Sequence, residues 1–301
     1  MFNPLKKSKM DKILKSVSDA QNNIKAIENQ MFNVELQPLM VADPMFKVVD
    51  TFGIFKSEGG NQLGVIGKRF APTQPMQVFE AFLDAIRDYG LAPEKLKFVE
   101  INGGSKVRFS IPLTEVSFTN IRGVKDTTIV TLNLQIGFDG KTKTSMFLTT
   151  LRLVCTNGAK KVFTEFQTSF KNVKGNLGKI VGMTDDVIKC GSQVTALKQL
   201  YVAMNKAEIN EDTKALYLKR VFDFELAKYG DYSKQRQNNI DLIMNSVDLE
   251  INRSGATLFG LYNGVTHYTN HVMKTENADS LYTGTGLSWN TKAEKVALQL
   301  L

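Results

Sequence analysis

A regular alternation of apolar and polar side chains over residues 128–138 constrains the fold of this chain more than any other feature. The apolar members are Val130, Leu132, Leu134, Ile136 and Phe138. A period of two places them on one face of a β-strand and leaves Thr131, Asn133 and Gln135 on the other. Asp139-Gly140, a dipeptide typical of tight turns, follows directly and leads into the run 142–155. We therefore expect an antiparallel hairpin with one buried face and one wet face.

Glycine pairs between apolar runs predict two further hairpins, at Gly59-Gly60 and at Gly103-Gly104. Between them Pro75 opens a helical pattern that Gly90 ends, and its apolar stripe should pack across the sheet. From about residue 177 helical periodicity replaces the strand pattern. These signals predict an α+β fold, with an antiparallel sheet and a packed crossing helix over residues 33–175 and a mainly helical region over 176–301.

Residues 1–32 are expected to form a separate amphipathic helix. Apolar residues recur there at spacings of three and four, at Met10, Ile13, Val17, Ala20, Ile24, Ile27 and Met31. This spacing defines one helical seam that a partner must cover. Docking onto the rest of the chain and contact with a second copy both satisfy it. We therefore treat Met10, Ile13, Val17, Ile24 and Ile27 as a docking or oligomer seam, and a homo-oligomer is one expectation.

The positive charge is unevenly distributed along the chain. The formal net charge is +8, and residues 51–180 hold 18 Lys and Arg against 10 Asp and Glu. Residues 1–50 hold seven against six, and residues 181–301 hold 13 against 14. A local excess of this kind is typical of a polyanion site, although many basic proteins bind nothing anionic.

The basic residues in and near the predicted sheet are the candidate site. Lys106 and Arg108 alternate with Val107 and Phe109, so they should lie on the wet face. Such a face can follow a phosphate backbone while aromatic rings stack on bases. The candidate nucleic-acid-binding residues are Lys68, Arg69, Lys95, Lys106, Arg108, Arg152, Lys160 and Lys161; other lysines of the region include Lys141 and Lys143, and the candidate stacking rings are Phe70, Phe118 and Phe147.

No catalytic, metal or cofactor constellation emerges from the sequence. His267 and His271 share a helical face at the spacing found in zinc proteases, but no glutamate lies between them. No GxxxxGK[ST] or GxGxxG sequence links a strand to a helix. We therefore predict no metal, no cofactor and no catalytic residues.

The expected compartment is the cytoplasm, of the host if the protein is phage-encoded. No run approaches the roughly 18 apolar residues that span a bilayer, and the start MFNPLKKSKMDKIL lacks the apolar stretch of a signal peptide. The only cysteines, Cys155 and Cys190, lie among apolar or small residues, which is typical of reduced thiols.

Several stretches carry a family resemblance: DPMFKVVDTFGIFKSEGG, LGVIGKRFAPTQPMQVFEAFLDAI, LRLVCTNG at 151–158 and ATLFGLYNGVTHYTNH at 256–271. Together they resemble the phage/plasmid-like protein family, domain of unknown function 932, over about residues 40–300. The resemblance implies a protein of a phage, prophage or plasmid, and it brings no catalytic residues. By analogy of fold, a sheet with a crossing helix and a basic face is similar in outline to single-strand annealing proteins.

The functional expectation is a nucleic-acid-binding protein of phage or plasmid DNA metabolism, in replication or recombination. Single-stranded DNA is the expected partner, with RNA as an alternative, bound or annealed through the basic sheet face of an oligomer. Two other classes stay open. One is a structural or host-interaction protein that works through the N-terminal seam. The other is a metal-dependent DNA-processing enzyme.

Overall fold

The computed structural model describes residues 4–42, 45–152, 160–170, 179, 182, 191–273 and 284–301. In the ranges 4–15, 41–42, 45–49, 160–167 and 191–193 it describes the backbone alone. The chain divides into two compact units. Unit 1 comprises Met1–Leu113, Leu132–Phe147 and Phe166–Lys189, and unit 2 comprises Thr114–Thr131, Leu148–Glu165 and Cys190–Leu301. Strands β5 to β8 contribute residues to both units.

A five-stranded antiparallel sheet has the order β4-β5-β6-β7-β8, as the alternating pattern predicts. Its strands are β4 (Lys97–Ile101), β5 (Lys106–Thr119), β6 (Lys125–Gly137), β7 (Thr144–Arg152) and β8 (Lys160–Phe170), with the short 3-10 helix η2 (Asn102–Gly104) between β4 and β5. The predicted hairpin around Asp139-Gly140 is the β6–β7 pair. Its apolar face, which includes Leu132, Leu134 and Phe138, is buried. The prediction of a wet second face is wrong, because Asn133 and Gln135 are buried as well.

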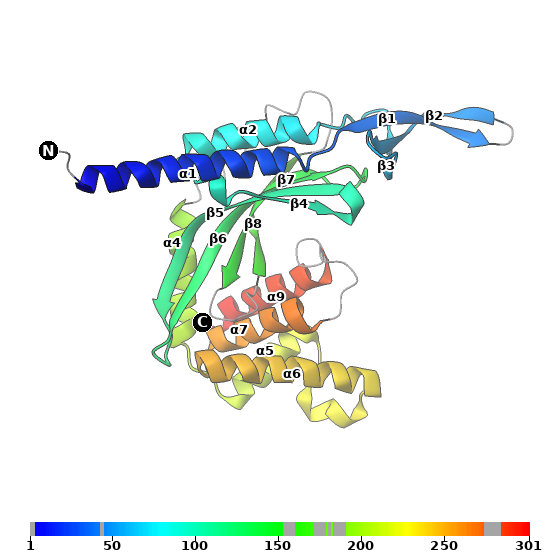
Figure 1. Cartoon of the computed structure of the whole chain (residues 1–301). Coiled ribbons are helices and arrows are strands. Elements are labelled where there is room, and N and C mark those ends of the chain that lie inside the picture. The colour runs from blue at the N-terminus through cyan, green and yellow to red at the C-terminus, as the bar shows by residue number, and fades with distance from the viewer. Residues whose placement is uncertain are drawn as a thin grey trace. The chain divides into compact units, whose positions relative to one another are not determined.

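A three-stranded antiparallel sheet precedes it in unit 1, with the order β1-β2-β3. The strands are β1 (Val34–Ala42), β2 (Met45–Lys56) and β3 (Gln62–Gly67), and Figure 1 shows β1 and β2 as a long hairpin in blue. Gly59-Gly60 forms the predicted turn between β2 and β3, with both residues at positive φ. On edge strand β1, Pro38 and a register shift between Pro38 and Met40 interrupt the outer backbone edge.

Aromatic side chains pack helix α2 (Pro75–Asp88) against the sheet in unit 1. Phe109 on β5 lies 5.6 Å from Phe79 and 6.4 Å from Phe82, both on α2, and 5.4 Å from Phe98 on β4, measured between ring centroids. Phe79, Phe82 and Phe109 have no exposed surface. The predicted crossing helix is therefore confirmed, and its first residue is Pro75 as expected.

The N-terminal helix α1 (Pro4–Glu28) contacts the short helix η1 (Pro93–Lys95) within unit 1. Asn23 Nδ2 donates hydrogen bonds of 2.9 Å to the carbonyls of Pro93 and Leu96. In the predicted seam, Ile27 is buried, Ile24 is half-buried and Val17 is 51% exposed. The side chains of Met10 and Ile13 lie outside the described residues. The C-terminal end of the seam therefore docks on the chain itself.

Unit 2 is mainly helical after the sheet, as the periodicity predicts. Its elements are α4 (Gly191–Lys206), α5 (Glu211–Phe222), η3 (Leu226–Asp231), α6 (Lys234–Ser254), α7 (Leu258–His267), the π-helical turn η4 (Tyr268–Val272) and α9 (Thr285–Leu300). Asn210, Ser233 and Thr257 cap α5, α6 and α7 by accepting backbone hydrogen bonds. Within the described ranges, no helix has the length and apolarity needed to cross a bilayer.

Candidate functional site

The structure separates the sequence-predicted basic residues into buried and exposed groups. Lys106, Arg108 and Arg152 are buried, whereas Lys68, Arg69 and Lys95 are exposed. Lys160 and Lys161 lie on β8, and their side chains lie outside the described residues, as do Cys155 and Cys190. The predicted basic residues therefore do not form the expected single cationic face. The buried group and the exposed group are described separately because only exposed cations can reach a phosphate backbone.

Arg108 belongs to a polar layer on the second face of the sheet in unit 1. Its Nε donates to Gln135 Oε1 at 3.0 Å, and its guanidinium lies 5.8 Å from the centre of the Phe147 ring. Beside it, Ser110 Oγ donates to Asn133 Oδ1 at 2.7 Å. Arg108 is only 5% exposed. The expectation that Arg108 and Phe147 face solvent is wrong, because both side chains are buried and Arg108 is in contact with Gln135 and the Phe147 ring.

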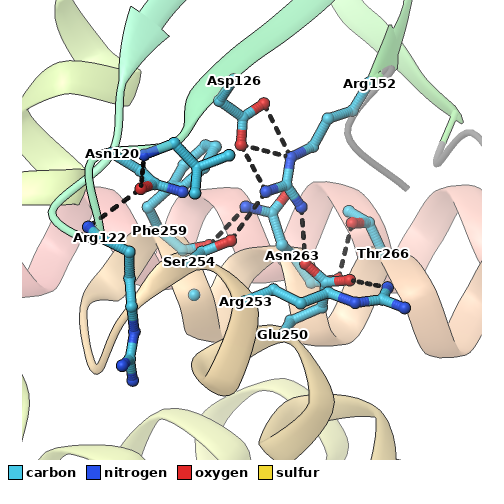
Figure 2. Close-up of polar contacts among 12 residues, drawn as sticks. Asn120, Arg122, Asp126, Arg152, Glu250, Arg253, Ser254, Phe259, Asn263 and Thr266 are labelled. Atoms are coloured by element: carbon cyan, nitrogen blue, oxygen red, sulfur yellow. Dashed lines mark hydrogen bonds and ion pairs between the residues drawn. The ribbon is translucent and has the colours of Figure 1, made fainter. Parts of the chain in front are cut away.

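Arg152 lies in a buried charge cluster of unit 2 (Figure 2). Its Nε donates to both carboxylate oxygens of Asp126 at 2.9 and 2.8 Å, and its Nη1 donates to Glu250 Oε2 at 2.6 Å. Its Nη2 donates to Ser254 Oγ, and Arg253 Nη1 donates to Glu250 Oε1 at 3.1 Å. We call Asp126, Arg152, Glu250, Arg253 and Ser254 the Arg152 cluster.

The Arg152 cluster balances two guanidinium groups with two carboxylates. Burial disfavours a charged guanidinium, but the hydrogen bonds and charges of Asp126 and Glu250 outweigh burial and raise the pKa of Arg152 above its ordinary value. Arg152 therefore stays charged and does not exchange a proton. With 4% of its surface exposed, it also lacks access to a phosphate backbone. Its predicted phosphate contact is not compatible with this position, and its surroundings fit a structural role.

The two histidines lie at the end of α7 and in the π-helical turn that follows it. The ring centroids of His267 and His271 are 5.2 Å apart. Burial and the charge of Arg253 lower the pKa of His267, and the opposing charge of Glu250 does not compensate. His267 is therefore neutral at pH 7. In the part of the chain that the structure describes, no three His, Cys, Asp or Glu side chains converge in a way that could hold a metal ion.

The exposed cations of unit 1 gather where β3 ends. Gly67 O accepts a hydrogen bond of 3.0 Å from Phe70 N, which closes a tight turn with Lys68 and Arg69 at its corner. A cleft of about 480 Å³ opens here, lined by Asp50, Val65, Ile66, Gly67, Lys68, Arg69, Phe70 and Gly140. The surface of the cleft is therefore partly cationic and partly apolar, and at its glycines it consists of bare backbone.

The β6–β7 turn brings two more exposed cations, Lys141 and Lys143, to the same region of unit 1. A Cβ atom added at Gly140 would lie 2.6 Å from the carbonyl oxygen of Val65, and one added at Gly64 would lie 2.6 Å from that of Phe138. The two backbones approach this closely because both positions are glycine. We call Lys68, Arg69, Lys141 and Lys143 the basic rim.

Asp139 holds the turn that carries Lys141 and Lys143. Its Oδ1 accepts from the backbone N–H groups of Lys141 at 2.9 Å and Thr142 at 2.6 Å, and its Oδ2 accepts from Thr142 Oγ1 at 2.7 Å. Burial alone would raise the pKa of Asp139, but these hydrogen bonds and the charge of Lys106 lower it below its usual value. The carboxylate is therefore ionised at neutral pH, and both of its oxygens accept hydrogen bonds from the turn.

One member of the basic rim is paired within the rim's own cleft. Lys68 Nζ lies 2.7 Å from Asp50 Oδ2, and both side chains are more than half exposed. Asp50 has a φ of 56°, and its carbonyl accepts a hydrogen bond from Lys68 N at 3.1 Å. Within the described part of the chain, Arg69, Lys141 and Lys143 take part in no ion pair. Lys95, also exposed, lies on η1, and it is not part of this cleft.

Comparison with known protein families identifies one family whose model matches this chain. The model of the family described as Domain of unknown function (DUF932) matches residues 62–293, a range that contains the basic rim and the Arg152 cluster. Neither the comparison with curated proteins nor that with solved structures returned a match. The matched range is more than half of the chain, and the chain belongs to the DUF932 family.

Proposed function

We propose that this protein binds nucleic acid, single-stranded DNA in the first instance, through the basic rim of unit 1. The observation that carries the proposal is the gathering of four exposed cations, Lys68, Arg69, Lys141 and Lys143, on two backbone segments that touch. Exposed cations can exchange their counterions for phosphates, which is the main source of affinity in sequence-independent binding. The buried Arg108 and Arg152 have no part in the proposal.

We propose that the protein acts in DNA metabolism of a phage or plasmid, and that annealing of the bound strand is one of its activities. We also propose that it forms a homo-oligomer in which each copy presents one basic rim. RNA offers the same phosphates and is one arm of the test. The structural or host-interaction alternative and the DNA-processing enzyme predict different outcomes of the same experiment.

The test is the salt dependence of binding by a double variant of the rim. We expect K68A/R69A to bind a labelled single-stranded oligonucleotide about tenfold more weakly than the wild type at 50 mM salt, uniformly across base sequences. The slope of log affinity against log salt should fall by about 1.4, since each cation lost from a single strand removes about 0.7. Fluorescence anisotropy between 50 and 200 mM salt measures both.

The matched control is K206A/K234A, which removes two exposed lysines of unit 2 and should leave affinity and slope unchanged. Equal weakening by both double variants would assign binding to overall charge and contradict the rim. Absence of binding to DNA and RNA by the wild type at 50 mM salt would favour the structural or host-interaction class. Cleavage of labelled DNA in the presence of Mg²⁺ would favour the enzyme.

Asp50 should oppose binding, because it holds Lys68 in an ion pair that a phosphate must replace. We expect D50N to strengthen single-strand binding about threefold at 50 mM salt, and we expect this gain to vanish when Lys68 is also replaced, in D50N/K68A. Titration of the four members of this double-mutant cycle measures the coupling. An equal gain in the presence and absence of Lys68 would show that Asp50 acts only through net charge.

A further inference from the structure

We infer that the cleft beside the basic rim receives one unpaired base of the bound strand, seated on Val65 and stacked on Phe70. The inference rests on the proposed function and specifies its ligand: a nucleotide whose base is free of a partner. The two can fail separately, because the rim is expected to bind phosphates and the cleft is expected to bind a base.

The charged cleft also contains apolar surface. Val65 is 49% exposed although it lies in the middle of β3, and Phe70 is half-buried at the end of the tight turn. Both line the cleft together with Lys68 and Arg69. An exposed apolar strand residue among cations offers nothing to a phosphate, so the cleft matches a ligand with both an anionic and an apolar part.

Two glycines leave space in the cleft. Gly67 and Gly140 line it without side chains, and a Cβ atom added at Gly67 would meet nothing nearer than the carbonyl oxygen of Asp50, at 3.8 Å. Period two places Gly67 on the same face of β3 as Val65. The cleft has a volume of about 480 Å³, within the range of about 300–1,000 Å³ for small-molecule sites, and it is largely open to solvent.

The cations and the aromatic ring of the cleft are neighbours in the sequence. The tight turn places Lys68 and Arg69 at its corner and Phe70 directly after it, so the cations and the aromatic ring are held by one short backbone segment. A nucleotide carries its phosphate and its base on one sugar, so one short backbone segment can contact both. In a duplex the bases are already stacked and paired, and taking one out has a cost. The cleft should therefore make the site prefer single strands over duplexes.

The experiment uses the full chain and three labelled probes of equal length: a single-stranded DNA, the same backbone with abasic sites in place of its bases, and a duplex. We expect F70A to bind the single strand about tenfold more weakly, the effect of losing one stacked base, with no change on the abasic strand. The salt slope should stay unchanged, because no cation is lost. F70W should keep the affinity of the wild type.

A second variant excludes a loss of packing as the cause. Val65 is exposed, so V65S should fold as the wild type does, and it should weaken binding to the single strand several-fold and to the abasic strand not at all. K68A/R69A should weaken binding to all three probes. The base site would be overturned if F70A and V65S lost as much affinity for the abasic strand as for the single strand, or lost none for either probe. The proposal that the rim binds phosphates would survive both outcomes. Failure of the wild type to bind any probe would overturn both.

Discussion

Replacement of Arg152 by alanine should lower the free energy of unfolding by about 3–5 kcal/mol, which is the cost of leaving buried carboxylates without their cation. Asp126 and Glu250 have no exposed surface, and both direct oxygens at the guanidinium of Arg152. The free-energy cost of burying these two carboxylates is offset by their contact with Arg152 and, for Glu250, also by its hydrogen bond with Arg253. Urea denaturation followed by circular dichroism at pH 7 measures the change.

R87A is the matched control for R152A. The guanidinium of Arg87 lies 3.6 Å from Asp84, and both side chains are at least half exposed. An ion pair of this kind contributes about 0–1 kcal/mol. If R152A were no more destabilising than R87A, the Arg152 cluster would not hold unit 2 together, and the assignment of a structural role to Arg152 would be lost.

Replacement of Phe109 by alanine should also destabilise the protein by about 3–5 kcal/mol, the usual cost of deleting a buried ring. Phe109 is fully buried and contacts aromatic rings of both α2 and β4, so its removal would leave a cavity between the helix and the sheet. Urea denaturation of the variant gives the value. V99A, at an exposed position on β4, should stay within about 0.5 kcal/mol of the wild type. A loss below 1 kcal/mol in F109A would contradict the central place of this ring in unit 1.

The elements of the sheet could be predicted because their signals are local. Alternation over residues 128–138, the turn at Asp139-Gly140 and the Pro75 helix start all depend on neighbours within a few positions, and all three are confirmed. The same holds for the helical second half. Periodicity identifies which residues share a face, and this information lies within the element itself.

Whether each face of the sheet is buried or exposed to solvent could not be predicted in the same way. Alternation separates Arg108 and Gln135 from the apolar face, but whether a polar face meets water depends on segments far away in sequence. The hydrogen bond between these two side chains lets a polar layer be buried. Alternation predicts a wet face because polar residues on strands are usually exposed, but Arg108 and Gln135 are buried in the tertiary structure.

The candidate sites show the same limit. Arg152 and Glu250 are separated by 98 residues, and no local pattern links them. Lys68 and Arg69 are exposed at a turn corner, where exposure is expected, and their role as phosphate contacts stays a prediction. The cleft residues Asp50 and Val65 carry no signal of their own, because their place beside the rim depends on the pairing of β2 with β3.

The β6–β7 turn and β3 approach each other closely at Gly64 and Gly140, where neither backbone carries a side chain. Because the β6–β7 turn rests directly on β3, the spacing of the Cα atoms that carry the two pairs of cations is set by main chain and not by loops that must first be ordered. The entropic cost of bringing them together falls on folding, before any partner arrives. On the proposed function, we expect the rim to favour a chain that can bend to match this spacing of positive charges over one that cannot.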